Sequence, residues 1–422
     1  MCSKSNKKNS GVLMPLIYIF SVIIALIAKI SIKDIMLEYQ YNVLIILIIM
    51  ELFTNLVSYT GIMELLSLKL ALLSKGSKKT VLILFGLLMF FISAFLNNIT
   101  AVLIILPIVF VLLKTIGVDQ KYVNIFFAVI LSLSNTGGAS SPIGDFPAIV
   151  IMSSGITSFM GYLVRAFPLF LLTSMIIICC YCLMVKEKQK NMELKKLSLD
   201  LLQSKHRNLS VNKEALYYLI IIFALMFVCW SIIPQSIVPP EVIALLGYVV
   251  ALLVLSKKNF RMVNTIDMKP VLMIGAFLFL SAIISKSGIL SDLANYLQTN
   301  IQSPKLLLIV IMLITSLASG IFGAGAASSA MMPIIVNLCN SVFSLQNDWV
   351  AIAYAASICA GSSLFLWSAT AGFILSKKIS DADLVDVNNK KLEWGIKEYF
   401  KYGILNYILQ LTISITIILL II

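Results

Sequence analysis

Long runs of apolar residues follow one another along this chain, separated by short polar segments. A helix needs about 20 residues to cross about 30 Å of hydrocarbon, and several runs reach that length. They lie at roughly 12–30, 42–60, 166–185, 215–233, 240–256, 270–286 and 403–422. The pattern predicts an all-α polytopic membrane protein.

Other apolar runs are interrupted by polar or small residues. The run 80–113 breaks at Asn97-Asn98, and each arm reaches only about 22–25 Å at 1.5 Å per residue. Lysines flank both ends of this run, which is typical of a hairpin that enters and leaves on one face. The run 122–155 breaks at "SNTGGASSPIGD", whose glycines and proline are incompatible with one continuous helix. We therefore predict a re-entrant helical hairpin over 80–113 and a broken transmembrane helix over 122–155.

The second half of the chain repeats this order. Its interrupted runs are 305–340, which breaks at "SGIFGAGAASS", and 350–376, which breaks at "AGSSLFLWSATAG". Ser93 aligns with Ser319 at an offset of 226 residues (319 − 93), and Gly137 aligns with Gly361 at 224 (361 − 137). The chain is therefore predicted to contain two copies of one unit, each with a hairpin and a broken helix.

The charge distribution predicts opposite orientations for the two copies. The chain has 32 Lys+Arg against 19 Asp+Glu, and the basic residues lie in short clusters between apolar runs, as expected from membrane topology rather than nucleic-acid binding. With the N-terminus in the cytoplasm, 27 of the 32 basic residues fall inside (32 − 5). The five outside are Lys29, Lys33, Arg165, Lys286 and Lys305. This threading puts the first hairpin on the cytoplasmic face, the second on the outer face and the C-terminus outside, so the repeats are inverted.

The predicted organisation has four parts. They are repeat one (1–185), a polar cytoplasmic linker (186–213), an extra transmembrane helix (214–238) and repeat two (239–422). Inverted repeats with paired interrupted helices are typical of secondary transporters whose site lies near the membrane midplane. The composition, 60% hydrophobic and 12% charged, excludes a water-soluble globule. We expect an integral protein of the plasma (inner) membrane.

Polar residues and glycines gather at the interruptions. The candidate ion or substrate ligands in repeat one are Asn97, Asn98, Thr100, Ser134, Asn135, Thr136, Gly137, Gly138, Ser140, Ser141 and Asp145. Those in repeat two are Gly323, Gly325, Ser328, Gly361, Ser362, Ser363, Ser368 and Thr370. Broken helices expose carbonyls, amides and half-helix dipoles, so the oxygens suit a hard cation such as sodium and the helix after Ile143 offers its amino end to an anion. The expected sodium ligands are Asn97, Asn135 and Asp145.

The strings "SAFLNNITAVLIILPIV" and "SNTGGASSPIGDFPAIVIM" resemble the paired signatures of the ion transporter superfamily. This superfamily includes arsenite-efflux permeases, D-type sodium/proton antiporters, citrate transporters and divalent-anion/sodium symporters, and the resemblance covers most of the chain. "GGASSPIGD" is most similar to the antiporter branch, whose aspartate takes part in ion binding, so the resemblance implies that role for Asp145 and neighbouring roles for Asn97 and Asn98. It also implies a homodimer.

The chain departs from the superfamily patterns at both hairpin tips. Several branches carry Asp-Asn where this chain has Asn97-Asn98, and the second tip has Gly323-Ala324, with neither carboxylate nor amide. Symporters of the superfamily place Ser-Asn-Thr at both tips, whereas this chain has Ser134-Asn135-Thr136 in its broken helix. The substrate therefore stays open.

Structural roles compete with these functional ones. Asp145 could be a helix N-cap, Asn97 and Asn98 could be interhelical hydrogen-bonding residues, and Gly320, Gly323 and Gly325 could be a small-residue packing stripe. Glu51, in the middle of the second run, is either a proton carrier or a scaffold carboxyl kept protonated by burial.

The sequence thus predicts a secondary active transporter of a small ion or organic anion, coupled to sodium or protons by alternating access. It needs no cofactor beyond the coupling ion, no enzymatic activity is expected, and its partners are the substrate, the lipid bilayer and a second copy. The alternatives are a sodium/proton antiporter, an oxyanion efflux permease, a channel and, in a different class, a membrane-embedded glycan or lipid transferase. The inverted repeat favours a transporter, because alternating access explains it and catalysis does not.

Overall fold

In the computed structural model of this chain, nearly all of the described residues are helical. The structure describes residues 18–27, 29–39, 41–186, 210–235, 237–256, 268–287, 292, 296–297, 299–343, 346–386 and 390–421. Within these ranges, the β-pairing is limited to one isolated antiparallel bridge between Val385 and Lys391. The all-α prediction is therefore confirmed, whereas most of the predicted linker, 187–209, lies outside the described residues.

The helices of the first half follow the predicted runs. After a short apolar helix, Tyr18–Ile27, come α2 (Ile32–Glu38), α3 (Tyr41–Tyr59), α4 (Ile62–Leu73), α5 (Lys78–Ser93), α6 (Asn98–Ile116), α7 (Gln120–Ala139), α8 (Phe146–Ser153) and α9 (Phe159–Met184). The helices α2 and α4 had not been predicted.

The second half has the same succession of long and interrupted helices. It contains α11 (Lys213–Ile232), α12 (Pro240–Ser256), α13 (Met268–Lys286), α15 (Pro304–Phe322), α16 (Ala324–Ser341), α17 (Asn347–Ser362), α18 (Gly372–Asp381) and α19 (Ile396–Ile421). By length and apolar composition, α3, α7, α9, α11, α15 and α19 can each cross a membrane.

The first hairpin consists of α5 and α6. Its arms return to the same end of the molecule, because Lys78 Nζ lies 3.1 Å from Asp119 Oδ1 and the Tyr122 hydroxyl donates to Lys78 O at 2.8 Å. The turn falls at the predicted break, where the Asn97 side chain accepts the Ile99 N–H at 2.9 Å and caps α6. The structure therefore has the hairpin that the interrupted run predicts.

The two hairpins contact their broken helices in the same way. At Gly137 an added Cβ would lie 2.4 Å from Phe90 O, and at Gly361 it would lie 2.0 Å from Ser316 O. These pairs share the offsets of the sequence alignment, 226 for the hairpin (316 − 90) and 224 for the broken helix. Only glycine allows α5 to cross α7, and α15 to cross α17, this closely.

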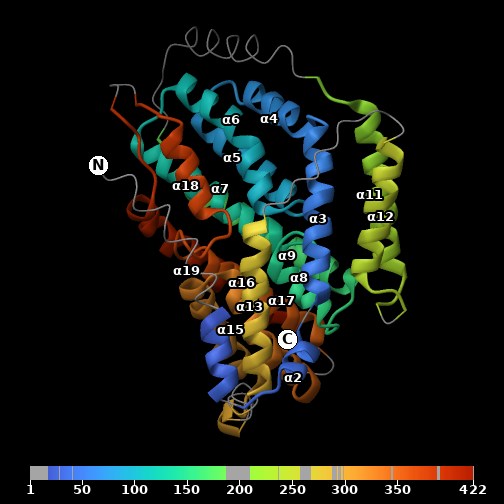
Figure 1. The fold of residues 1–422 in the computed structure, drawn as a ribbon. Coiled ribbons are helices and arrows are strands. Elements are labelled where there is room, and N and C mark those ends of the chain that lie inside the picture. The colour runs from blue at the N-terminus through green and yellow to red at the C-terminus, as the bar shows by residue number, and fades with distance from the viewer. Residues whose placement is uncertain are drawn as a thin grey trace.

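The next helix of each half adds a second matching contact. The Tyr162 hydroxyl on α9 donates to Ala139 O at 2.7 Å, and the Tyr399 hydroxyl on α19 donates to Ser363 O at 2.7 Å. Ala139 and Ser363 are again 224 residues apart. These contacts support two copies of one unit. Figure 1 shows the first hairpin, α5 and α6, near the top of the view and α15 of the second hairpin near the bottom. That the copies are inverted in a membrane stays a prediction.

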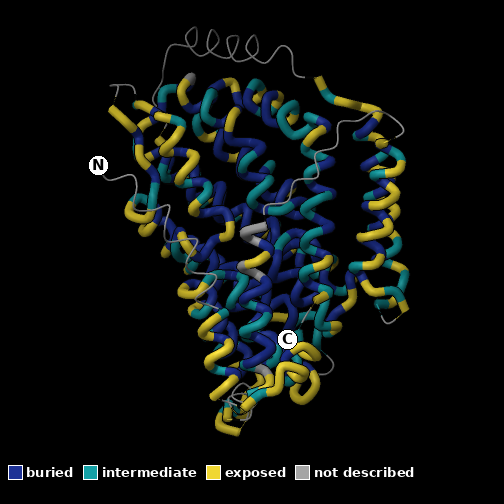
Figure 2. The backbone as a smooth tube through the Cα atoms, in the orientation of Figure 1, coloured by how far each residue is buried: buried dark blue, intermediate teal, exposed yellow. Residues whose placement is uncertain are grey.

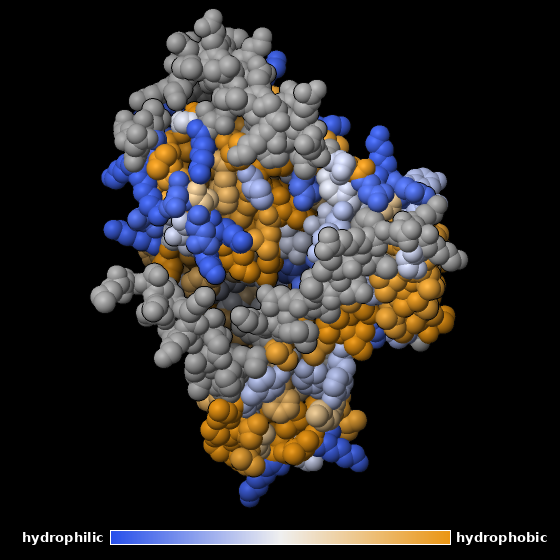
Figure 3. All heavy atoms as spheres, turned by 45° about the horizontal axis from the view of Figure 1, so that its top comes forward, coloured by the Kyte–Doolittle hydropathy of each residue, from blue (hydrophilic) through white to orange (hydrophobic). Residues whose placement is uncertain are grey.

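Two groups of helices make up the molecule. In one, α5, α7 and α9 pack together with α15, α17 and α19, and α7 is buried along its length. In the other, α3 packs against α12 and α13, and α11 packs against α12. Figure 2 shows the buried residues through the middle of the molecule, with α11 and α12 more exposed at one side. Figure 3 shows hydrophobic surface between hydrophilic ends, as a bilayer requires.

Cysteine labelling tests the predicted orientation. In a variant whose 7 native cysteines are replaced, Lys75→Cys and Lys121→Cys flank the first hairpin, and we expect both to be labelled from the cytoplasm. Gln235→Cys and Ser341→Cys should be labelled from outside by a membrane-impermeant maleimide. If Lys75→Cys and Lys121→Cys were labelled from opposite faces, the hairpin could not be re-entrant.

The glycine crossings predict a difference in stability. Gly361→Ala brings a Cβ within 2.0 Å of Ser316 O, so we expect about 1–3 kcal/mol of destabilisation from overpacking. Gly325→Ala is the matched control, because its Cβ would lie 3.6 Å from the Phe146 ring, an ordinary contact distance. Melting temperatures of the purified variants in detergent measure both effects, and equal losses would contradict the crossing.

Candidate ion and substrate site

Asp145 lies between the two halves of the first broken helix. Its Oδ1 accepts the Phe146 N–H at 2.9 Å, and its Oδ2 accepts the Asn98 amide Nδ2–H at 2.8 Å. The residue is the N-cap of α8, but its bond goes to the adjacent N–H instead of N2 or N3, and N2 is Pro147, which has no N–H. The carboxylate is therefore positioned by one amide side chain and one backbone N–H.

Asn98 joins the hairpin tip to the broken helix. It is the first residue of α6 and is fully buried. The Ser93 hydroxyl, from the last residue of α5, donates to Asn98 Oδ1, which leaves the amide Nδ2–H directed at Asp145. The structure thus brings two of the predicted ligands, Asn98 and Asp145, into direct contact.

Backbone oxygens surround the neighbouring glycine. An added Cβ at Gly144 would lie 2.6 Å from Gly138 O, 2.8 Å from Ser93 O and 2.9 Å from Ala94 O. At Gly138 it would lie 2.7 Å from Asp145 Cβ. The two glycines therefore let the hairpin tip and the broken helix meet closely enough to gather carbonyl oxygens beside the carboxylate.

Most other predicted side chains of repeat one hydrogen-bond within the packed helices. The Ser134 and Ser140 hydroxyls donate to Leu131 O and Gly137 O at 2.9 and 2.6 Å. Further hydrogen bonds join the Ser141 hydroxyl to Ala94 O and the Thr136 hydroxyl to Ser174 Oγ. Thr100 lies partly buried in the first turn of α6. Of these bonds, the one from Ser141 to Ala94 O joins the helix break to the hairpin tip.

Asn135 hydrogen-bonds to different residues from those that Asp145 contacts. Its Nδ2 donates to Ser363 Oγ at 3.0 Å, and Gln410 Nε2 on α19 donates to Ser363 Oγ at 3.1 Å and to Ser132 Oγ at 2.8 Å. The Gln410 Oε1 atom is buried without a hydrogen-bond partner in the described part of the chain. The three expected sodium ligands, Asn97, Asn135 and Asp145, thus contact different partners.

Gln410 had not been predicted. Its signal in the sequence is a polar residue inside the apolar run 403–422, four residues after Asn406 and so on the same helix face. The side chain is buried, and it links α19 to both broken helices. It stabilises the crossing of α7 and α17.

The corresponding region of repeat two contains no carboxylate. Gly323, with φ +91°, forms the turn between α15 and α16. The Ser368 hydroxyl, which has one proton to donate, lies within hydrogen-bond distance of Gly361 O, Ser362 O and Phe365 O, at 3.2, 3.0 and 2.8 Å. Of the other predicted residues, the Ser328 hydroxyl donates to Gly325 O and Thr370 is exposed.

The two copies meet at the amino ends of α8 and α16, which pack against each other. Gly325, in the first turn of α16, is close enough to Phe146, the first residue of α8, for an added Cβ to lie 3.6 Å from its ring. Amino ends of helices carry partial positive charge and unpaired N–H groups. Their convergence suits an anion, and α16 supplies more of the free N–H groups, because the Phe146 N–H of α8 is bonded to Asp145 and Pro147 has none. Glu51 lies partly buried on α3, which also packs against α8.

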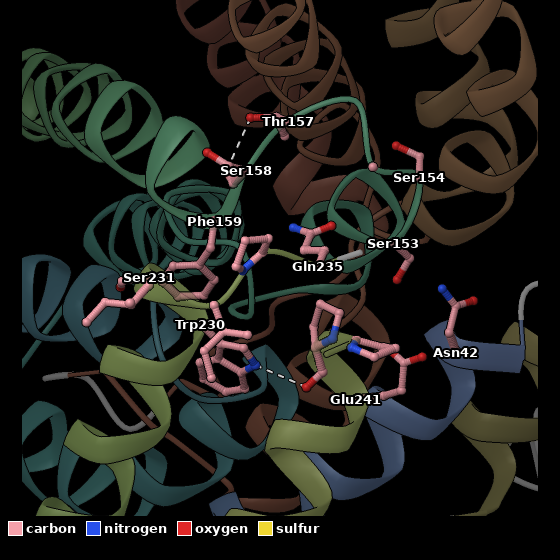
Figure 4. A pocket seen from close by; sticks show the side chains of 16 residues that line it. Asn42, Ser153, Ser154, Thr157, Ser158, Phe159, Trp230, Ser231, Gln235 and Glu241 are labelled. Atoms are coloured by element: carbon pink, nitrogen blue, oxygen red, sulfur yellow. Dashed lines mark hydrogen bonds between the residues drawn. The ribbon is translucent and has the colours of Figure 1, made fainter. Parts of the chain in front are cut away.

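A separate pocket of about 740 Å³ opens between α3, the α8–α9 turn and the α11–α12 connection. Figure 4 shows Asn42, Ser153, Gln235 and Glu241 around it. Its lining includes one acidic residue and no basic residue, and none of the predicted ligands. Sequence patterns did not indicate this pocket, because three distant segments form it.

The model of the citrate transporter family matches residues 7–359. This chain belongs to the citrate transporter family. It is therefore an integral membrane transporter, and the resemblance to the ion transporter superfamily is confirmed.

Individual relatives are distant but similar over most of their length. A 46 kDa membrane protein of Mycobacterium leprae is 23% identical over 341 residues, 80% of this chain and 78% of that protein. The magnetosome protein MamN of Paramagnetospirillum magneticum is 23% identical over 362 residues, 84% of this chain and 81% of that one. The crystal structure of the Alcanivorax borkumensis YdaH transporter aligns with a TM-score of 0.55 at 12% identity, covering 92% of this chain and 86% of that one, which shows a shared fold.

Substitution of Asp145 distinguishes an ion ligand from a helix cap. Asp145→Asn keeps the size and a capping oxygen but removes the charge, so we expect transport to collapse while stability changes by only about 1 kcal/mol. Asp383→Asn is the matched control, because Asp383 pairs with Lys391 in an exposed loop. The measurements are transport in proteoliposomes and melting temperature in detergent.

A helix cap alone would behave in the opposite way. Asparagine caps a helix about as well as aspartate, so Asp145→Asn would then transport normally, and only Asp145→Ala would lose about 0.5–2 kcal/mol of stability. Normal coupled transport by Asp145→Asn would contradict the ion-binding role.

Proposed function

We propose that this member of the citrate transporter family is a secondary active transporter of a small organic anion, coupled to a sodium ion or a proton at Asp145. The observation that carries the proposal is the set of neutral partners around this carboxylate. Both of its oxygens accept hydrogen bonds from neutral donors, Asn98 and the Phe146 N–H. Ion pairs between described residues include Lys78–Asp119, Arg165–Asp348, Lys286–Glu38 and Lys391–Asp383, and none of these includes Asp145.

A carboxylate inside a membrane protein needs a compensating charge. Removing an ionised carboxylate from water is costly unless it is paired with a cation or neutralised by a proton. Asn98 and the Phe146 N–H reduce this cost but carry no full charge. A sodium ion or a proton would complete the site, and the Gly138 and Ser93 carbonyl oxygens that pack against Gly144, next to Asp145, are of the hard kind that sodium prefers.

The amino ends of α8 and α16 support an anionic substrate. Neither helix contains Lys, Arg or His, so the anion would be bound by N–H groups, hydroxyls and the bound cation. This arrangement would couple the binding of the cation to the binding of the anion, because each ion would raise the affinity of the protein for the other. The family's description makes citrate and related carboxylates the first substrates to test.

Alternating access is supported by the division into two helix groups. The group that contains both hairpins touches the other group mainly through α13 against α16 and α3 against α8. Movement of one group relative to the other would expose the site first to one side and then to the other. Inverted repeats provide two conformations of similar energy for such a change.

Sodium/proton antiport is the second candidate. It is favoured by the presence of one carboxylate at the site, for which sodium and a proton would compete. An antiporter of this kind needs no organic substrate, so ion fluxes alone distinguish it from the first candidate.

Transport by the purified protein in proteoliposomes tests both candidates, with sodium and pH gradients imposed separately. We expect one of the gradients to drive accumulation of a carboxylate such as citrate above its equilibrium level. Sodium flux in exchange for protons, without any anion requirement, would favour the antiporter. Anion flux that ignores both gradients would contradict cation coupling.

A further inference from the structure

We infer that two equivalent hydrogen bonds between the helix groups form alternately, one in each of the two conformations of the transporter. One joins the Ser281 hydroxyl on α13 to Ser329 O on α16 and is present in this structure. The other joins the Thr54 hydroxyl on α3 to Leu103 O on α6 in the opposite conformation. The inference rests on the proposed function, since it assigns residues to the movement of one group relative to the other.

A proline creates the acceptor in the second copy. Pro333 lies inside α16 and has no N–H, so Ser329 O, four residues earlier, lacks its usual helical donor. Hydroxyls of neighbouring helices commonly pair such carbonyls in membrane proteins. Ser281, which is buried on α13, does so here. Because α13 belongs to the group without hairpins, this bond joins the two groups.

The contact between α13 and α16 extends beyond this bond. One turn before Ser281, the Phe277 ring lies close to Gly325, which is one turn before Ser329. An added Cβ at Gly325 would lie 3.9 Å from that ring. The second hairpin is therefore packed along α13, with the hydrogen bond as the polar part of the contact.

The first hairpin contains an equivalent acceptor. The hairpin offset of 226 pairs Pro333 with Pro107 (333 − 107). It also pairs Ser329 with Leu103 (329 − 103). Pro107 lies inside α6, so Leu103 O also lacks the N–H of the fourth residue after it. Each hairpin thus has one carbonyl without a helical donor at the same place in its second arm.

The helix α3 contains an equivalent donor. It aligns with α13 at an offset of 227, which pairs Thr60 with Ser287 (287 − 60). Both of these hydroxyls donate to the carbonyl three residues earlier at 2.7 Å, which supports the alignment. The same offset pairs Ser281 with Thr54 (281 − 54), and Thr54 is buried. Each copy therefore has a hydroxyl for the carbonyl of its own hairpin.

This structure holds the bond of the second copy alone. The helix α13 packs along α16, whereas α3 contacts α6 only slightly. Within the described part of the chain, Ser281 is bonded to Ser329 O but no hydrogen bond joins Thr54 to Leu103 O. If the copies are inverted, the opposite conformation places α6 against α3 as α16 now lies against α13. One bond then breaks as the other forms, which keeps the two conformations similar in energy.

Distances between spin labels, measured by pulsed electron paramagnetic resonance, test this inference. In a variant whose 7 native cysteines are replaced, exposed labels at Lys121→Cys on α7 and Lys213→Cys on α11 report the separation of the two groups. We expect Ser281→Ala to lower the population with the separation of this structure about 2- to 12-fold relative to the other population, the range for one neutral hydrogen bond. Thr54→Val removes the other donor and should raise this ratio by a similar factor.

Tyr354→Phe is the matched control. The Tyr354 hydroxyl on α17 donates to Ser328 O at 2.6 Å, the carbonyl before that of Ser329, but donor and acceptor both belong to the hairpin group. Its loss should lower the melting temperature without changing the population ratio. Combining Ser281→Ala with Thr54→Val should return the ratio to near the parent value, because each conformation then lacks one bond.

The possible outcomes separate the inference from the proposed function. Shifts in the same direction for Ser281→Ala and Thr54→Val, or the absence of a shift in either, would overturn the inference and leave alternating access intact. A comparable shift in Tyr354→Phe would also overturn it, because the ratio would then respond to any loss of packing. A single separation in the parent under every substrate, sodium and pH condition would contradict alternating access, and with it both the inference and the proposed function.

Discussion

The carboxylate of Asp145, placed between two half-helices in an apolar protein, is the constraint on which this account depends. On our proposal, neutral donors and a mobile cation together replace the water that a negative charge at this place has lost. The Asn98 amide and the Phe146 N–H are the donors. Their positions depend in turn on the hairpin tip, on the helix break and on glycines that let the two approach.

The two copies that the sequence predicts make matching contacts but differ in chemistry. Glycine crossings and tyrosine hydroxyls occur at equivalent places in both. The first copy adds an amide and a carboxylate, whereas the second adds the Ser368 hydroxyl and the amino end of α16. On our proposal the repeated backbone would support alternating access, and the differences between the copies would assign the cation to one copy and leave the anion between them.

Local patterns in the sequence predicted the elements that local chemistry determines. Apolar run lengths predicted most helices, and the breaks at Asn97 and Gly323 were located by polar or small residues that a helix interior disfavours. Matching Gly137 to Gly361 predicted two copies, and the shared crossings support that match. The short helices α2 and α4 were missed, because neither produces an apolar run long enough to cross a bilayer.

Contacts between distant segments could not be predicted from patterns along the chain. Asn135 was grouped with Asp145 because both belong to one motif, yet its amide bonds to Ser363, 228 residues away. Gln410 links three helices that no local pattern associates. The pocket beside Gln235 likewise depends on how separate segments pack.

Infrared difference spectroscopy with and without sodium tests the central claim most directly, because it detects the protonation and pairing of a carboxyl group. We predict that sodium changes the carboxyl stretching bands of the parent protein and that this change is missing in Asp145→Asn. Bands that do not respond to sodium, or a response that persists in Asp145→Asn, would contradict the claim that the charge of Asp145 is balanced by the coupling ion.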